Sequence, residues 1–185
     1  MKTRSKSKTE EWNPYTSKWE AAFEKGLDLT VNKTDNILYL GASSGTTVNR
    51  VSKLTKGIIF AVENSPQMAI NLVRLSKKRQ NIAPIFSDAR DVVFITKALF
   101  NKKINILFQD IPSRDQVEIL INASKLVSKE CRIFFSLKTQ SISQQNPKKT
   151  LQEVMEKLKT CFKIILVKNL EPFHKKHYFL ILRGS

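Results

Sequence analysis

Short apolar runs that alternate with helix-like segments constrain the fold of this sequence more than any other feature. The first five runs lie at residues 36–41, 57–63, 82–86, 104–110 and 132–138. They are apolar nearly throughout, which is typical of strands buried on both faces of a parallel sheet. The segments between them fit helices at 46–55, at 66–79, from beyond residue 90 to about 100, and up to 127. Because parallel strands need such crossover helices, the alternation predicts an α/β fold.

The C-terminal part of the chain breaks this alternation. Apolar runs at residues 162–170 and 177–183 are separated only by residues 171–176. This gap is too short for a crossover helix, so the two runs should pair antiparallel. A helix at 149–160 precedes them, and another within 12–25 opens the folded part of the chain. The whole pattern predicts a mostly parallel seven-stranded sheet with an antiparallel C-terminal hairpin.

The chain length of 185 residues argues for a single domain, because domains commonly have about 100–200 residues. We expect this domain to span residues 12–185 and to follow a basic, flexible tail at 1–11. No apolar segment follows the tail, so it is not a secretory signal, and no run is long enough to cross a membrane. Cys131 and Cys161 lie far apart, and each opens an apolar run. They indicate reduced thiols in a cytoplasmic protein and no metal site.

The net charge of +16, from 32 Lys and Arg against 16 Asp and Glu, is the first indication of function. The excess positive side chains repel one another, and a polyanionic partner would relieve this repulsion. Nucleic acid is the leading candidate for this partner, and an anionic membrane surface is the second. The third interpretation is a generally lysine-rich surface without a specific partner.

Polar and charged residues follow the strands at the edge where an open parallel sheet binds its ligand. They are Glu63, Asp88, Asp110 and Lys138, and the first strand leads into a turn of small residues at 41–47. Small side chains such as those of Gly41 and Ala42 let the backbone approach a ligand closely. Glu63 follows the glycines by about twenty residues, the spacing at which an acid holds ribose hydroxyls.

The turn after the first strand narrows the class of ligand. Three residues separate Gly41 from Gly45, so the turn does not match the dinucleotide fingerprint G-x-G-x-x-G. It also lacks the Gly-Lys-Ser/Thr that grips phosphates in a Walker loop. An acidic end of the second strand with a short G-x-x-x-G turn suits a nucleoside without a phosphate chain. S-adenosylmethionine is such a cofactor.

Several segments resemble the fibrillarin family. They are residues 12–18 (WNPYTSK), 38–47 (LYLGASSGTT), 61–63, 78–82, 88–90, 110–116, 136–138 and 170–173. The resemblance runs in the same order from Trp12 to Arg183, which is nearly the whole chain. It implies a Rossmann-like class I S-adenosylmethionine-dependent methyltransferase fold. It also implies an RNA 2′-O-ribose methyltransferase that modifies guide-selected nucleotides of rRNA and tRNA within a box C/D ribonucleoprotein.

The resemblance implies particular contacts with S-adenosylmethionine. Thr46 and Thr47 would lie on its methionine side. Its ribose and adenine edge would contact Glu63 and Asn64, and its adenine amine and ring would contact Asp88 and Ala89. The methionyl end and the methyl group would lie against Asp110, Ile111, Pro112 and Ser113.

The resemblance also implies a catalytic set of Lys18, Asp110, Lys138 and His177. A ribose hydroxyl is a poor nucleophile, so lysine ammonium groups should favour the developing alkoxide, and a carboxylate should orient them. We expect Asp110 and Lys138 to be the orienting or proton-accepting pair and Lys18 to be a cation on the substrate side. His177 is a polar supporter, and His174 competes with it for the family position.

The implied partners are a box C/D guide RNA, its target RNA, a Nop-domain scaffold protein and, through the complex, a kink-turn-binding protein. Archaeal fibrillarins usually carry a small β-rich region at the N-terminus, whereas about eleven residues precede Trp12 here. This shortened N-terminus predicts a reduced or altered docking surface for the scaffold protein. Thr16 and Ser113 replace the usual Arg and Gln of the family. The chain also lacks a Gly/Arg-rich tail, which favours an archaeal-type, cytoplasmic protein.

Two alternatives come from other functional classes. A catalytically weak family member could serve as an RNA-binding or assembly subunit, and the short N-terminus favours this hypothesis. The other alternative is a protein glutamine methyltransferase. The presence of Lys18, Asp110 and Lys138 favours the RNA methyltransferase over the assembly subunit.

Overall fold

The computed structural model describes residues 13–184. Strands and helices alternate along this part of the chain. The strands are β1 (Ile37–Leu40), β2 (Ile59–Glu63), β3 (Ile82–Phe86), β4 (Ile106–Gln109), β5 (Arg132–Lys138), β6 (Phe162–Asn169) and β7 (His177–Gly184). The helices are α1 (Lys18–Glu24), α2 (Thr46–Val51), α3 (Pro66–Ser76), α4 (Val92–Ala98), α5 (Gln116–Ser124), α6 (Thr139–Ile142) and α7 (Pro147–Lys159). The predicted tail at 1–11 and Trp12 lie outside the described residues. Between residues 13 and 184, every helix is too short or too polar to cross a bilayer.

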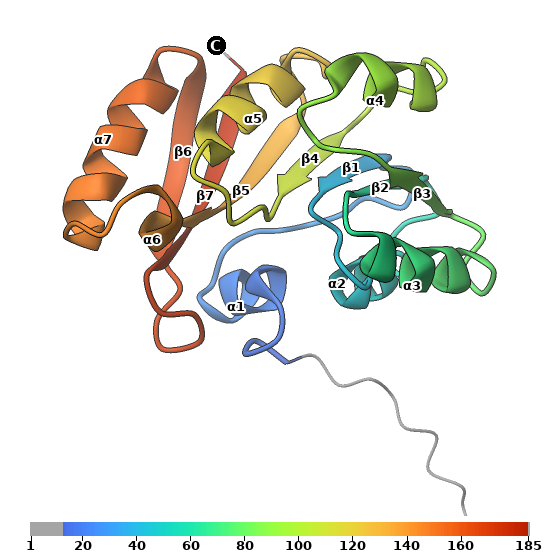
Figure 1. Ribbon diagram of the computed structural model, residues 1–185, viewed down its shortest axis with the longest axis horizontal. Coiled ribbons are helices and arrows are strands. Elements are labelled where there is room, and N and C mark those ends of the chain that lie inside the picture. The colour runs from blue at the N-terminus through green and yellow to red at the C-terminus, as the bar shows by residue number, and fades with distance from the viewer. Residues whose placement is uncertain (1–12, 185) are drawn as a thin grey trace, which may run out of the picture.

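A single seven-stranded sheet has the order β3-β2-β1-β4-β5-β7-β6. The pairs among β1 to β5 are parallel. β7 lies between β5 and β6 and is antiparallel to both. This topology confirms the predicted mostly parallel sheet with an antiparallel C-terminal hairpin. Helices α1, α2 and α3 cover one face, and α4, α5 and α7 cover the other (Figure 1).

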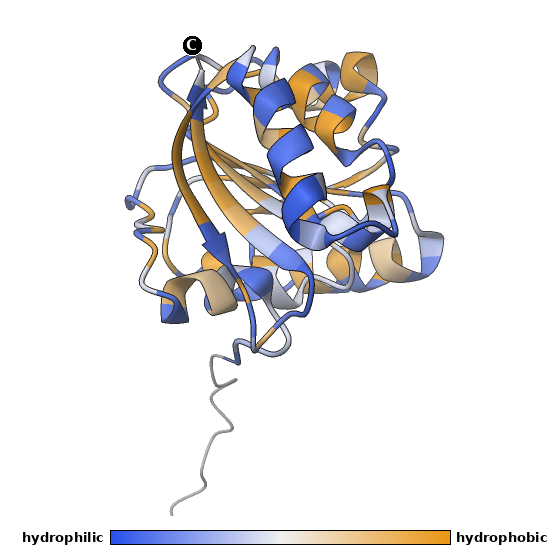
Figure 2. Ribbon diagram, turned by 90° about the vertical axis from the view of Figure 1, so that its left-hand side faces the viewer, coloured by the Kyte–Doolittle hydropathy of each residue, from blue (hydrophilic) through white to orange (hydrophobic). Residues whose placement is uncertain are grey.

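The core has two layers because successive strand residues point to opposite faces of the sheet. In β1, Leu38 and Leu40 pack with α4, α5 and α7, whereas Ile37 and Tyr39 pack with α1, α2 and α3. Figure 2 shows the hydrophobic strands of the sheet packed between helices in which hydrophobic and hydrophilic residues alternate. Three strand aromatics lie in this core: Phe108, Phe134 and Phe135 are at most 1% exposed.

Helix α1 is held on the sheet by its capping residue and one aromatic side chain. Ser17 precedes the helix, and its hydroxyl accepts a hydrogen bond from the Glu20 amide, as Ser does at helix starts. The Trp19 ring packs edge-on against Phe108 and Phe134, with ring centroids 5.2 and 5.3 Å apart. The helix is shorter than the predicted segment 12–25 because it begins only after this cap. Its fixed position places Lys18 at the carboxyl edge of the sheet.

The ends of several other elements also differ from the sequence prediction. α7 begins at Pro147, two residues earlier than expected, because Asn146 caps it by accepting a hydrogen bond from the Lys148 amide. The single-turn helix α6 was not predicted, since its four residues carry no hydrophobic periodicity. The existence and type of every longer element between residues 13 and 184 agree with the prediction.

The predicted state of the two cysteines agrees with the structure, in which both are free thiols. Cys131 is buried, and this burial raises the pKa of its thiol to about 12. The thiol is therefore protonated at neutral pH. It acts as a small apolar core residue rather than as a nucleophile.

Candidate active site

The turn between β1 and α2 brings the backbone against the end of β4. Gly41 has φ +81°, and a Cβ at this position would lie 2.6 Å from the carbonyl oxygen of Asp110. Gly45 has φ +89°, and a Cβ there would meet the side chains of Leu72 and Leu75 in α3 within 2.9 Å. Both positions therefore require glycine. These close contacts are made with the protein's own backbone and side chains, and the predicted close approach to a ligand stays a prediction.

Glu63 links two of the loops at this edge. One carboxylate oxygen accepts a hydrogen bond from the Ser43 amide at 2.7 Å, and the other accepts one from the Ser65 amide at 2.8 Å. These bonds fix the carboxylate beside the turn that follows β1. An ionised carboxylate has about four acceptor positions, so each oxygen can still accept a further hydrogen bond from a ligand.

A cavity of about 240 Å³ lies at the carboxyl ends of β1 to β4. Eight residues proposed for the cofactor line it: Gly41, Glu63, Asn64, Asp88, Ala89, Asp110, Ile111 and Pro112. Sequence analysis did not single out its other lining residues, which are Ser43, Val62, Ser87 and Arg90. Three carboxylates face this cavity against one guanidinium, so its lining favours a ligand that carries positive charge.

Four of the proposed cofactor residues lie elsewhere. Ala42 is buried beneath the turn. Thr47 is also buried, and its hydroxyl lies 3.0 Å from the Ser17 hydroxyl, which ties α2 to the start of α1. Thr46 opens on a second cavity on the other side of the turn. Ser113 lies outside the cavity lining, where it contacts Arg90.

Arg90 joins the loop after β3 to the loop after β4. Its guanidinium donates two hydrogen bonds to Asp115, both at 2.7 Å, two to Asp88, both at 3.0 Å, and one to the Ser113 hydroxyl. The guanidinium and the Ser113 hydroxyl hold the pKa of Asp115 well below its usual range. The sequence pattern does not reveal this contact, because residues 90 and 115 become neighbours only when the loops fold over the cavity.

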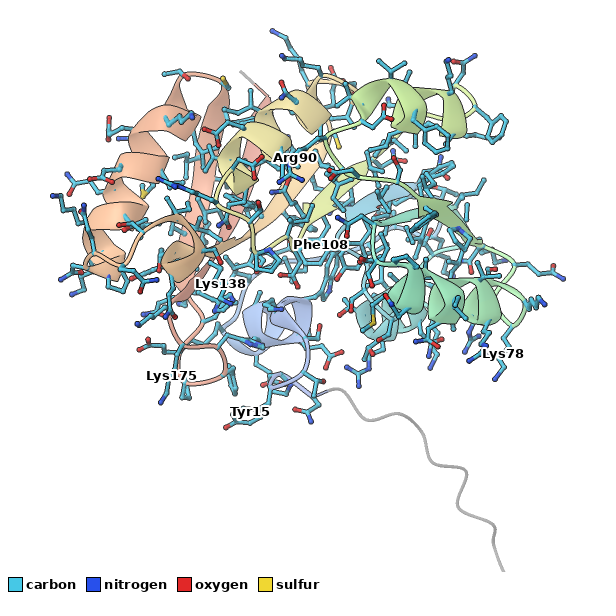
Figure 3. The ribbon with its side chains drawn as sticks, in the orientation of Figure 1. Tyr15, Lys78, Arg90, Phe108, Lys138 and Lys175 are labelled. Atoms are coloured by element: carbon cyan, nitrogen blue, oxygen red, sulfur yellow. The ribbon has the colours of Figure 1, made fainter. Side chains whose placement is uncertain are left out.

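Of the predicted catalytic residues, Lys18 contacts Asp110 directly. The Lys18 ammonium nitrogen lies 3.2 Å from an Asp110 carboxylate oxygen. Lys138 ends β5 on the strand next to β4 and is paired with His177 of β7 in the sheet register. Asp110 therefore forms its ion pair with Lys18, and among residues 13–184 no ion pair joins it to Lys138. Figure 3 shows Lys138 on the α1 side of the molecule.

Gln116 fixes the backbone of Lys138. Its side-chain oxygen accepts a hydrogen bond from the Lys138 amide at 3.0 Å, and its side-chain nitrogen donates to the Lys138 carbonyl at 3.1 Å. The Gln116 carbonyl in turn accepts a hydrogen bond from the side chain of Gln109 at 2.6 Å. Both glutamines are fully buried. This support was missed by sequence analysis, because a glutamine in a helix start carries no distinctive pattern.

Both histidines lie near this group, with ring centroids 5.7 Å apart. Burial lowers the pKa of His174, and the Lys18 ammonium lowers it further. Burial also lowers the pKa of His177, whose Nδ1 lies 2.8 Å from the Lys175 carbonyl oxygen. Because a carbonyl can only accept, this contact assigns the proton to Nδ1 and leaves Nε2 of the neutral ring as an acceptor.

The family model described as fibrillarin matches residues 2–184. A fibrillarin-like rRNA/tRNA 2′-O-methyltransferase from Archaeoglobus fulgidus is 34% identical over 173 residues, covering 92% of this chain and 81% of that protein. The structure of a fibrillarin/Nop5p complex has a TM-score of 0.90 at 31% identity and covers 95% of this chain and 84% of the other.

A third similar protein, Aeropyrum pernix fibrillarin with natively bound S-adenosyl-L-methionine, has a TM-score of 0.77 at 30% identity. The match covers 93% of this chain and 76% of that one. These similarities confirm the predicted Rossmann-like class I methyltransferase fold. The similarity to fibrillarins thus extends over nearly the whole chain, and the chain belongs to the fibrillarin family.

Proposed function

We propose that this protein is an RNA 2′-O-ribose methyltransferase that uses S-adenosylmethionine to modify guide-selected nucleotides of rRNA and tRNA. One observation carries the proposal: an acidic cavity of about 240 Å³ adjoins the Lys18–Asp110 ion pair, with Lys138 on the next strand. The relative from Archaeoglobus fulgidus is named for this activity.

The cavity suits S-adenosylmethionine by its shape and charge. Because Gly41 has no Cβ, the turn that borders the cavity can lie against the end of β4. Glu63 lies where an acid can accept hydrogen bonds from ribose hydroxyls, and Asp88 lies farther along the same cavity, on the proposed adenine side. The sulfonium of the bound cofactor supplies an activated methyl group. Asp110 faces the cavity with a negative charge that complements this cation.

The chain's own residues would prepare the ribose hydroxyl for transfer. Asp110 orients the Lys18 ammonium, and Gln116 holds the backbone from which the Lys138 side chain extends. Two ammonium groups on the substrate side stabilise the negative charge that develops on the hydroxyl oxygen as it loses its proton. His177, neutral and fixed through Nδ1, supports this group as a polar neighbour.

We further propose that the protein works inside a box C/D ribonucleoprotein. The similar structure of a fibrillarin/Nop5p complex supports a Nop-domain scaffold protein as one partner. A guide RNA and a kink-turn-binding protein complete the proposed assembly, and base pairing with the guide selects the target nucleotide. The net charge of +16 favours association with these RNAs.

Methyl transfer in reconstituted complexes tests the proposal. Labelled S-adenosylmethionine and guide-paired RNA are supplied to complexes that carry the wild-type chain, Lys138→Ala or, as a control, Lys102→Ala at the opposite edge of the sheet. We expect label on a single ribose 2′-oxygen with the wild type and the control, and its loss with Lys138→Ala. If the wild type binds the cofactor but transfers nothing, the assembly-subunit alternative replaces the proposal. Label on glutamine side chains would favour the protein methyltransferase.

A further inference from the structure

A second cavity, of about 230 Å³, lies on the outer side of the turn that borders the cofactor cavity. Ser43 lines the first cavity, and the next residue, Ser44, lines the second. The two cavities therefore border the same turn.

The charge of the second cavity is opposite to that of the first. Glu63, Asp88 and Asp110 face the first cavity, and among residues 13–184 Arg90 is the one cation in its lining. The second is lined by Arg74 and Lys78, and no carboxylate from the described part of the chain lines it. It therefore repels the cationic sulfonium of the cofactor and attracts an anion.

The geometry of α3 explains why these cations converge. Asn71, Arg74, Leu75 and Lys78 are spaced by three and four residues, so they share one face of the helix and of the turn that continues it. The side chains of Leu72 and Leu75 pack closely against Gly45, which fixes this face against the turn after β1. The cavity is thus built on a rigid junction of α2 and α3.

Within the described residues, no carboxylate neutralises the cationic side chains of this cavity. Among residues 13–184, Arg74, Lys77 and Lys78 form no ion pair with a carboxylate. The cavity also presents groups that can donate hydrogen bonds, the Ser44 and Thr46 hydroxyls and the Asn71 amide. This set of donors matches the oxygen atoms of a phosphodiester.

We propose that the cavity between α2 and α3 binds a backbone phosphate of the RNA strand that carries the target nucleotide. The proposal rests on the proposed function, because it assigns a subsite for the same substrate. Figure 3 shows Lys78 on the same lower side of the view as Tyr15 and Lys175, at the far end from the β6–β7 loop. An RNA strand bound at the reaction centre and continuing along this side reaches α3. The contact positions the strand and reads no base.

Salt-dependent RNA binding by the full chain tests the subsite. Fluorescence anisotropy with a single-stranded target RNA is measured between 50 and 200 mM KCl for the wild type and for Arg74→Ala/Lys78→Ala. Each phosphate contact contributes about 0.7 to the slope of log K against log salt concentration for a single strand. We expect the double variant to lower the slope by about 0.7 to 1.4 for one or two lost contacts.

Lys102→Ala/Lys103→Ala is the matched control, since it removes the same charge at the amino-terminal edge of the sheet, just before β4. Its slope should equal that of the wild type. Circular dichroism and the thermal midpoint establish that both double variants fold. An Arg74→Ala/Lys78→Ala slope equal to that of the control overturns the subsite.

Calorimetric titration with S-adenosylmethionine separates the two cavities. Its Kd should be the same for the wild type and Arg74→Ala/Lys78→Ala, and a weakened Kd would assign the cavity to the cofactor and overturn the proposal. Neither binding measurement requires turnover. A failure of methyl transfer would therefore refute the proposed function, whereas the salt dependence of RNA binding would still decide whether the subsite exists.

Discussion

At the residue scale, Arg90 is the side chain that most directly shapes the proposed cofactor cavity. Its guanidinium holds Asp88 and Asp115 on two separate loops, and it lines the cavity itself. The guanidinium is about half exposed, so its ion pairs are screened by solvent and stabilise the fold only modestly. Its principal effect is therefore on the geometry of the loops.

Replacing Arg90 should weaken cofactor binding without changing the chemical step. We expect Arg90→Ala to raise the KM for S-adenosylmethionine about tenfold, which corresponds to about 1.4 kcal/mol, with kcat close to that of the wild type. Steady-state kinetics in the reconstituted complex measure both constants. Arg114→Ala, an exposed arginine in the next loop, is the control and should leave KM unchanged. Equal KM values for the two variants would contradict a role for Arg90 in shaping the cavity.

The two histidines should make stability depend on pH below neutrality. Their folded-state pKa values lie below the ordinary 6.5, so the unfolded chain binds protons more readily than the folded one. The free energy of unfolding should therefore fall as pH decreases from 6.5 toward the folded-state values. Above pH 6.5 both states are neutral at these rings, and this contribution to the pH dependence disappears.

Urea unfolding at pH 5.5 and 7.5 checks this dependence. His174→Gln/His177→Gln removes both imidazoles of a chain that has only 2 histidines, so no other imidazole contributes. We expect the double variant to lose less free energy of unfolding than the wild type between the two pH values. An equal or larger loss in the variant would show that carboxylates alone set the acid sensitivity.

At the element scale, α1 couples the core to the proposed reaction centre. Trp19 is 2% exposed and packs on the aromatic side chains of β4 and β5. The preceding residue, Lys18, reaches Asp110. A change that loosens the helix therefore displaces a proposed catalytic cation.

Truncating Trp19 should destabilise the fold strongly. We expect Trp19→Ala to lower the free energy of unfolding by about 3–5 kcal/mol, because it removes buried aromatic contacts and leaves a cavity. Chemical denaturation measures the change. Phe23→Ala on the same helix removes a side chain that is 61% exposed, and it should cost much less. Similar losses for the two variants would mean that Trp19 does not anchor α1.

The predicted ends of strands agree with the structure more closely than the predicted starts of helices. Strands that are apolar throughout were predicted to within about two residues, because burial on both faces leaves a pattern that no loop imitates. The ends of α1 and α7 were less certain, because they are set by Ser17 and Asn146 as capping residues. Single hydrogen bonds of this kind decide where a helix starts without changing its periodicity.

The proposed site was predictable where it follows the strand ends and unpredictable where loops fold across them. Glu63, Asp88 and Asp110 could be placed at one edge from the βα alternation alone. The partner of Asp110 could not, because Lys18 reaches it from a helix far away in the sequence. Arg90 and Gln116 were missed for the same reason, since each acts through contacts between segments that only the folded chain brings together.

At the scale of the whole molecule, the excess positive charge is distributed so that the proposed cofactor site is acidic and its neighbour is basic. Ligands of opposite charge can therefore bind on the two sides of one turn without competing. The arrangement also makes a prediction about selectivity. S-adenosylmethionine should stabilise the protein, whereas a nucleoside triphosphate of similar size should be repelled by three carboxylates.

Thermal unfolding with each ligand tests this selectivity. At 100 times its Kd, S-adenosylmethionine should stabilise the folded state by about 2.7 kcal/mol, which raises the Tm of a chain of this length by about 5–11 °C. ATP at the same concentration should leave the Tm nearly unchanged. An equal rise with both ligands would show that the cavity recognises adenosine without regard to charge.

The place of β7 in the sheet has a consequence for synthesis of the protein on the ribosome. β7 is the last strand of the described chain, yet it lies between β5 and β6 and pairs with both. Until residue 184 has left the exit tunnel, the nascent chain exposes the unpaired edge of β5, a template for aggregation. His177 reaches its place beside Lys138 only when this edge closes. The emergence of β7 therefore both protects the edge of β5 and brings His177 beside Lys138 of the proposed catalytic group, and a nascent chain that is released before β7 emerges has neither.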